Sequence, residues 1–278
     1  MSPANRPLLD FMIVGAQKSG TTALAHYLAQ HPRIRMSSVK EPHLFDAPDY
    51  SPDWTPAQID ERYRPYFEHA GESPADAVSE VTPASTESTP SLAAFKLLHG
   101  EATPIYLFLP EIAPQLRRYN ADLKLIVLLR DPAERAISHY YMEKNKGYEG
   151  LPLGLALTIE PFRLRQCRDR RRHGSAWRRH SYRRRGLYSL QLRNLYRYFD
   201  ARQVLLVRTD DLARNHEGVL RRVFEFLDAG PCKGIPSEKV FEGERGGRRH
   251  LLVSWLLRVT FLPEFVRMRR FRIDEARV

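Results

Sequence analysis

The sequence predicts an α/β protein in one domain, with a central parallel sheet flanked by helices. Short apolar runs at 11–14, 123–129 and 203–208 have the length of strands, and each is followed by a segment with helical spacing of apolar residues. The runs are apolar at consecutive positions, as in strands buried on both faces. Alternation of strands with helices favours a parallel sheet covered on both sides.

The first predicted strand, 11–14, ends at Gly15 and leads into a helix that begins near Thr21, buries Leu24 and Leu28, and stops at Pro32. The segment 48–90 has many prolines and few apolar runs. We expect it to be a long surface connection with short helices.

The clearest strand, 123–129, runs directly into a strong helix start. Asp131 is the expected N-cap, Pro132 occupies the first helical position, and Glu134 completes a capping-box pattern. The helix should extend to about residue 146. Helical spacing returns at 187–199, followed by a strand at 203–208 and an amphipathic helix at 212–227. We see no boundary that divides residues 1–278. The expected core is 9–228, and the sequence leaves the placement of the C-terminal segment 250–278 open.

The net charge of +11 indicates an anionic substrate, cofactor or surface. Cys167 and Cys232 are far apart and lack metal-ligand spacing, which argues against a disulfide framework or a structural zinc site. The first strand begins within about ten residues of Met1. We therefore expect no signal peptide or membrane anchor, and a cytoplasmic enzyme.

The sequence "GAQKSGTT" connects the first strand to the first helix. A glycine-bounded turn of this kind points backbone N–H groups and the helix dipole at an anion. In ATPases a lysine follows the second glycine, whereas here Lys18 lies inside the loop and Thr21 follows Gly20. That position suits neutralising charge on a bridging oxygen as a bond to a 5′-phosphate breaks. The alternative is a glycine turn with a solvated lysine.

Arg130 and Ser138 form a second group of candidate anion-binding residues. Arg130 follows the 123–129 strand at the edge where parallel sheets bind ligands, and Ser138 falls in the second turn of the next helix. The two side chains could bind a second phosphate together. The alternative is an arginine paired with Asp131 or Glu134 and a serine that faces water.

Together, "GAQKSGTT" and "LIVLLRDPAERAISHY" resemble the cofactor motifs of sulfotransferases that use 3′-phosphoadenosine 5′-phosphosulfate (PAPS), whose fold is similar to that of P-loop nucleotide-binding proteins. The likeness is to the carbohydrate branch, which includes heparan sulfate N- and 3-O-sulfotransferases and bacterial relatives. It continues through "VKEPHLFD", "GEATPIYL", "RRGLYSLQLRNLYRYF" and "VRTDDLARNHEGVLRRVFEFL". The resemblance implies sulfuryl transfer to a hydroxyl, with an amine second, and no metal requirement.

The resemblance also implies roles for individual residues. It places Glu41 as the general base on the acceptor, with His43 in reserve, and Lys18 at the leaving group. Residues that would hold the phosphosulfate are Lys18, Ser19, Gly20, Thr21 and Thr22, and those that would hold the 3′-phosphate are Arg130 and Ser138. Ala102 stands where heparan-acting members often have lysine, which disfavours a heparan-type acceptor. A glycan, glycolipid or natural product therefore remains open.

Eleven arginines and one acid lie between Arg163 and Arg185. We interpret this stretch as a surface that attracts an anionic acceptor or a lipid surface, and the alternative is a solvated basic segment with no role beyond solubility. Nucleic-acid binding is disfavoured because few aromatic residues interleave the charges. The segment 251–262 is too short to span a bilayer, so it docks on the domain or lies on a membrane. Two other functions remain open: a nucleotide-dependent phosphoryl transferase (kinase) of the P-loop class, and a non-catalytic basic module that binds nucleic acid or membrane.

Overall fold

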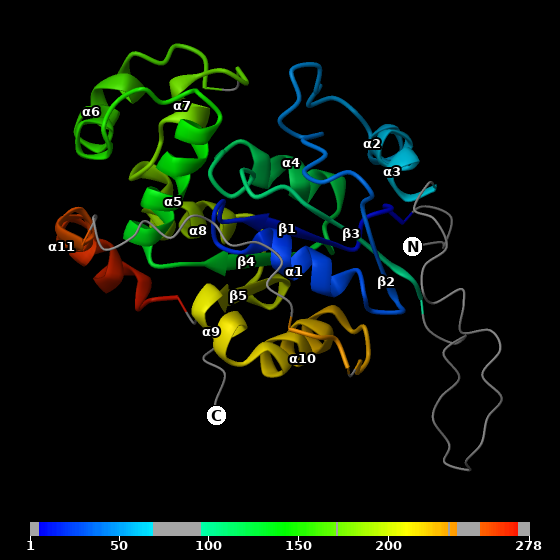
Figure 1. Cartoon of the computed structure of the whole chain (residues 1–278). Coiled ribbons are helices and arrows are strands. Elements are labelled where there is room, and N and C mark those ends of the chain that lie inside the picture. Colours follow the sequence, from blue (N-terminus) through cyan, green and yellow to red (C-terminus); the bar gives the residue numbers. More distant parts are fainter. Residues whose placement is uncertain (1–5, 69–95, 171, 233, 238–250, 272–278) are drawn as a thin grey trace.

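Five parallel strands form the sheet at the centre of the computed structural model (Figure 1). Their spatial order is β2 (Ile34–Met36), β3 (Leu98–Ala102), β1 (Phe11–Gly15), β4 (Lys124–Leu129) and β5 (Val204–Arg208). Every neighbouring pair is parallel, which confirms the predicted fold class. The structure describes residues 6–68, 96–170, 172–232, 234–237 and 251–271.

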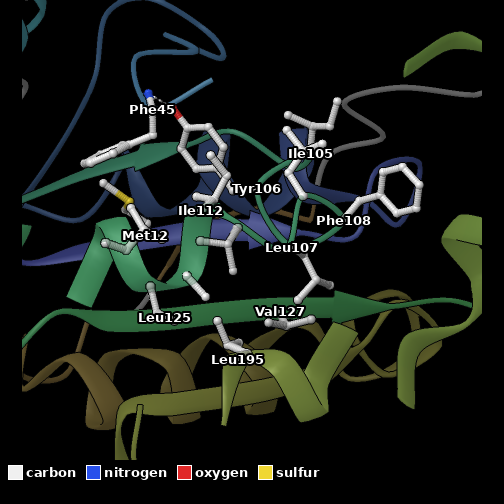
Figure 2. Packing of buried hydrophobic residues seen from close by; sticks show 14 of the residues in the cluster. Met12, Phe45, Ile105, Tyr106, Leu107, Phe108, Ile112, Leu125, Val127 and Leu195 are labelled. Atoms are coloured by element: carbon white, nitrogen blue, oxygen red, sulfur yellow. Dashed lines mark hydrogen bonds between the residues drawn. The ribbon is translucent and has the colours of Figure 1, made fainter. Parts of the chain in front are cut away.

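Each face of the sheet is covered by its own helices, because successive strand residues point to opposite sides. Ile13, Ile126 and Leu205 pack on one face, beneath α1 (Thr21–Leu28), α9 (Thr209–Arg214) and α10 (His216–Leu227). Met12, Leu125 and Val127 point to the other face. They pack against α2 (Pro56–Tyr63), α3 (Pro65–Glu68), α4 (Ile112–Tyr119) and α8 (Tyr188–Leu195). Figure 2 shows part of this cluster, including Ile112 of α4 and Leu195 of α8.

A third apolar cluster lies beyond the carboxyl end of β4. It joins α5 (Pro132–Asn145), α6 (Leu153–Arg165) and α11 (Leu251–Met268), through residues such as Ile137, Leu157 and Phe261. Three short elements, α7 (Ala176–Arg179), η4 (Arg184–Gly186) and η5 (Ala201–Gln203), complete the order. The segment 250–278 thus contributes a helix that packs beside α5 (Figure 1).

The chain passes from one side of β1 to the other between β3 and β4. The switch point of the sheet therefore lies between β1 and β4, where open α/β sheets bind ligands at the carboxyl ends of the strands. The loop after β1 contains Lys18, and the residue after β4 is Arg130.

Three local predictions need correction. Asp131 caps α5 by accepting from the N–H groups of Ala133 and Glu134, but the Glu134 carboxylate turns to arginine side chains instead of closing a capping box. The helix predicted at 212–227 is two helices, because the Asn215 side chain caps α10 by accepting from the Gly218 N–H group.

The surface connection predicted at 48–90 contains the expected short helices where the structure describes it, but it does not lie wholly on the surface. Helices α2 and α3 bury Ile59, Tyr63 and Phe67 in the core. Residues 69–90 lie outside the described part of the chain.

Candidate active site

The loop between β1 and α1 has the geometry of an anion cradle. Lys18 and Gly20 both have left-handed backbone conformations, with φ of 69° and 85°, and Gly20 is the N-cap of α1. A Cβ atom at Gly15 would lie 2.6 Å from Leu107 Cβ, so only glycine fits there. No side chain caps α1, which leaves its first N–H groups and its positive dipole end available to an anion.

Hydrogen bonds from Thr209 connect the loop to neighbouring elements of the fold. Ser19 is fully buried, and its carbonyl oxygen lies 2.7 Å from the Thr209 hydroxyl at the start of α9. The same hydroxyl lies 3.1 Å from the carbonyl oxygen of Leu129, so it ties the loop to the end of β4. Thr21 is buried and Thr22 is half-buried at the start of α1.

Arg130 is paired with Glu134, which is one of the alternatives that the sequence left open. Its Nε and Nη2 atoms donate to the Glu134 carboxylate at 3.3 and 3.1 Å. The other carboxylate oxygen accepts from Arg258 of α11 at 3.1 Å. Ser138 lies one turn after Glu134 on α5 and is almost buried. A phosphate at Arg130 would therefore compete with Glu134.

Glu41, His43 and Asp46 form a continuous array. The His43 Nε2 atom lies 3.4 Å from the Glu41 carboxylate, and its Nδ1 atom lies 3.0 Å from the Asp46 carboxylate. Arg178, from the arginine-rich stretch, approaches Asp46 at 2.5 Å from the far side. Glu41 and His43 also have left-handed backbones, with φ of 54° and 57°. Strain of this kind in non-glycine residues clusters at functional sites.

The contacts in this array shift the pKa values of Glu41 and His43 in opposite directions. Burial opposes the charge on His43, but its hydrogen bonds to Asp46 and Glu41 and their negative charges raise its pKa to about 9. Burial would raise the pKa of Glu41, but the hydrogen bond and the charge of His43 hold that pKa below its ordinary value. At neutral pH Glu41 is therefore ionised, and His43 is protonated and cannot act as the reserve base.

Lys18 lies within electrostatic range of Arg130 and Glu41. Burial and the positive charges of Lys40, Lys146 and Arg130 lower its pKa, and the negative charge of Glu41 opposes them. The loop after β1, the loop that carries Glu41 and the end of β4 therefore converge on one place. The concentration of positive charge favours a ligand with several negative charges.

A buried cationic cluster behind the loop adds to this field. Arg185 is buried and its guanidinium donates to the Gln17 side chain in the loop. Arg135 is also fully buried, and its guanidinium donates to the Tyr182 carbonyl oxygen. Burial and the charges of Arg185, Arg135 and Lys18 hold the pKa of His139 well below its ordinary value, so His139 is neutral. None of these three residues is predicted from the sequence to belong to the site, although all lie in or beside the quoted motifs.

The arginine-rich stretch divides into structural and exposed members. Arg163 pairs with Glu149 at 2.5 Å, and Arg178 and Arg185 are buried. Arg168 and Arg172 are exposed and line a cavity of about 860 Å³ between the end of α6 and α7. The cavity does not include the phosphate loop. It adjoins the array, because the ring of His173, next to Arg172, lies 6.1 Å from that of His43.

The free energy of unfolding should fall as the pH rises through about 9. The folded pKa of His43, about 9, lies above the ordinary value of 6.5, so His43 stabilises the fold fully below about pH 6.5 and loses this contribution near pH 9. Denaturant unfolding between about pH 6 and pH 10 measures this. His43→Gln is the control, since glutamine does not titrate. An identical pH dependence in both proteins would show that His43 is not protonated in the fold.

The sheet topology and the loop after β1 define a P-loop-like α/β protein, and positive charge is concentrated beside that loop. Residues 8–240 match the family model described as "Sulfotransferase domain", and the chain therefore belongs to the sulfotransferase family. The predicted family and enzyme class are confirmed. Membership in this family sets aside the phosphoryl-transferase and non-catalytic alternatives.

Known proteins agree with this assignment. Heparan sulfate glucosamine 3-O-sulfotransferase 6 of Mus musculus is 31% identical over 245 residues, which cover 86% of this chain and 57% of that protein. Membrane-associated sulfotransferase kil1 of Dictyostelium discoideum is 36% identical over 134 residues, which cover 48% of this chain and 23% of that protein. A crystal structure of a sulfotransferase from Alicyclobacillus acidocaldarius aligns with a TM-score of 0.67 and 26% identity, and covers 96% of this chain and 95% of that one. The chain thus spans little more than half of the mouse relative and under a quarter of kil1.

Proposed function

We propose that the chain transfers a sulfuryl group from PAPS to a hydroxyl group of its acceptor, with an amine as the second choice. The observation that carries the proposal is the convergence of Lys18, in an anion-binding loop, with the ionised carboxylate of Glu41. The loop geometry fits a 5′-phosphosulfate, since Gly20 and the open start of α1 supply N–H donors to an anion. PAPS would supply an activated sulfuryl group on a phosphate leaving group.

In this proposal Glu41 accepts the proton of the acceptor hydroxyl, and His43 holds the carboxylate in place through its Nε2–H group. Lys18 neutralises the charge that develops on the leaving oxygen. Arg130 and Ser138 hold the 3′-phosphate after Glu134 yields its ion pair with Arg130. Asp46 fixes the tautomer and charge of His43 and is itself held by Arg178.

For the acceptor we propose an anionic molecule, with a glycan as the first class to test. The mouse relative is named for a heparan sulfate glucosamine acceptor. The exposed Arg168 and Arg172 in the cavity beside the array support an anionic group on the acceptor. Ala102, where heparan-acting members often have lysine, favours a glycan other than heparan sulfate. Lipid and natural-product hydroxyls belong in the same acceptor panel.

The product nucleotide, adenosine 3′,5′-bisphosphate, is expected to stabilise the fold without added metal. At about a hundred times its Kd the free energy of unfolding should rise by roughly 2.7 kcal/mol. AMP, which lacks the 3′-phosphate, should do far less, and Arg130→Gln should reduce the difference between the two nucleotides. Thermal unfolding with a chelator present measures this. Equal stabilisation by AMP, or a requirement for magnesium, would contradict the assignment of Arg130 and Ser138.

Replacing both Arg168 and Arg172 with glutamine is expected to raise the KM for an anionic acceptor and to flatten its salt dependence. Exposed charges act over about 8 Å at physiological ionic strength, so the effect should shrink as salt is added. PAPS affinity should not change. The matched control replaces the exposed Arg165 and Arg202, neither of which lines the cavity. If the KM for the acceptor at low salt is the same in the variant and the wild type, Arg168 and Arg172 do not attract the acceptor and are only solvated surface residues.

A further inference from the structure

Helix α11 is apolar on two opposite sides, and only one side is covered. Leu257, Phe261 and Met268 are buried on the inner side. Glu264, also buried, accepts from the Ser189 N–H group at 2.5 Å and from its hydroxyl at 2.8 Å, which fixes the helix against α8. Arg258 adds ion pairs to Asp131 and Glu134. The helix is therefore a docked part of the fold, with a defined outer face.

The outer face is a continuous apolar stripe. Its spacing of three and four residues places the stripe on one side of a helix, and its members are Leu252 (69% exposed), Trp255 (61%), Val259 (45%), Leu262 (57%) and Val266 (62%). Leu256 and Phe265 extend the stripe sideways. Seven of the fourteen exposed large hydrophobic side chains in the described part of the chain are on this helix. A concentration of this kind marks an interaction surface.

Within residues 251–271 the exposed charged side chains are all of one sign. Arg267, Arg269 and Arg270 are exposed at the end of the helix, and Glu264, the sole acid among residues 251–271, is buried. The complementary surface is therefore apolar and anionic together. A second copy of the helix would cover the stripe but offers no exposed acid to the arginines in either orientation.

We propose that the outer face of α11 binds an anionic phospholipid membrane. Tryptophan, phenylalanine and leucine on one face with arginine beside them is the pattern of a helix that lies in the headgroup region, at a depth of roughly 5–10 Å. Among the residues that the structure describes, no helix is long and apolar enough to cross a bilayer. Because the inner side of α11 is packed on the fold, the proposed contact is with the membrane surface. It does not depend on the proposed reaction.

Flotation of the full chain with vesicles tests the proposal. Binding is expected to vesicles of equimolar phosphatidylglycerol and phosphatidylcholine, and much less to phosphatidylcholine alone. Trp255→Gln with Leu262→Gln should weaken binding by about tenfold or more. Changing Arg267, Arg269 and Arg270 to glutamine should reduce the preference for anionic vesicles roughly fivefold per arginine.

The matched control is Leu155→Gln with Phe162→Gln, which removes two exposed apolar side chains from α6 (48% and 63% exposed). This variant should bind vesicles as the wild type does. Thermal unfolding verifies that all the variants are folded. Vesicle binding that survives the Trp255 and Leu262 changes would overturn the proposal, and so would no binding by the wild type. Dimerisation in solution that the same changes abolish, without vesicle binding, would assign the face to a second copy instead.

Discussion

Glu41→Gln is expected to lower kcat by roughly 10²- to 10⁴-fold while the affinity for adenosine 3′,5′-bisphosphate stays nearly unchanged. The amide keeps the shape of the side chain and can still meet the His43 ring, but it cannot accept the acceptor proton. The effect should appear in kcat, because the carboxylate does its work only as the acceptor attacks. Single-turnover kinetics with saturating PAPS, together with bisphosphate binding, measure both quantities.

Glu225→Gln provides the control for that variant. Glu225 is an exposed carboxylate on α10, and it forms a 4.0 Å contact with Arg221 in the same helix. Turnover at the wild-type rate in Glu41→Gln, with the chemical step rate-limiting, would show that Glu41 is not the base. His43 would not replace it at neutral pH, because its raised pKa keeps it protonated.

Lys18→Ala is expected to lower kcat by about 10²- to 10³-fold and to weaken bisphosphate binding as well. Lys18 lies in the loop that would meet the nucleotide before reaction as well as during it, so its loss should affect both measurements. This combined loss distinguishes Lys18 from Glu41, whose change should spare binding. Initial rates and nucleotide titration on the same preparations provide the comparison.

Lys124→Ala is the corresponding control. Lys124 begins β4, at the opposite edge of the sheet, where its ammonium group donates to the Phe226 carbonyl oxygen at 2.7 Å. Its removal should reduce stability slightly without affecting kcat or nucleotide binding. A Lys18→Ala enzyme with normal nucleotide affinity and normal kcat would remove the lysine from the proposed mechanism.

The parts of the fold that could be predicted from sequence are those with local signals. The apolar runs of β1, β4 and β5 and the Asp131 cap of α5 require no distant partner to be recognised. Strand β3 has the sequence "LHGEA", in which a glycine and a buried glutamate conceal the strand. Gly100 is needed because a Cβ atom there would lie 2.1 Å from the Phe11 ring, a contact created only by the sheet.

The residues of the candidate site also divide into those with a local sequence signal and those whose role depends on distant contacts. Lys18, Glu41 and Arg130 lie in short contiguous motifs and could be nominated directly. The role of Asp46 depends on its contact with Arg178, which comes from a distant part of the chain. Composition suggested that the arginine-rich stretch is solvated or steers a ligand, but Arg178 and Arg185 are buried structural members. Charge counts cannot separate these roles, because burial is decided by packing.

Among the residues that the structure describes, four non-glycine residues have left-handed backbones, and three of them are Lys18, Glu41 and His43. Such a conformation is unfavourable by roughly 1–2 kcal/mol for a residue with a Cβ atom, so the backbone taken alone favours glycine at each of these positions. Backbone preference does not account for a lysine, a glutamate and a histidine there. In a gene copy that has been released from catalysis, these three codons should be among the first to drift toward glycine or asparagine. Their identity could therefore separate active members of a gene lineage from degenerate ones before any assay is run.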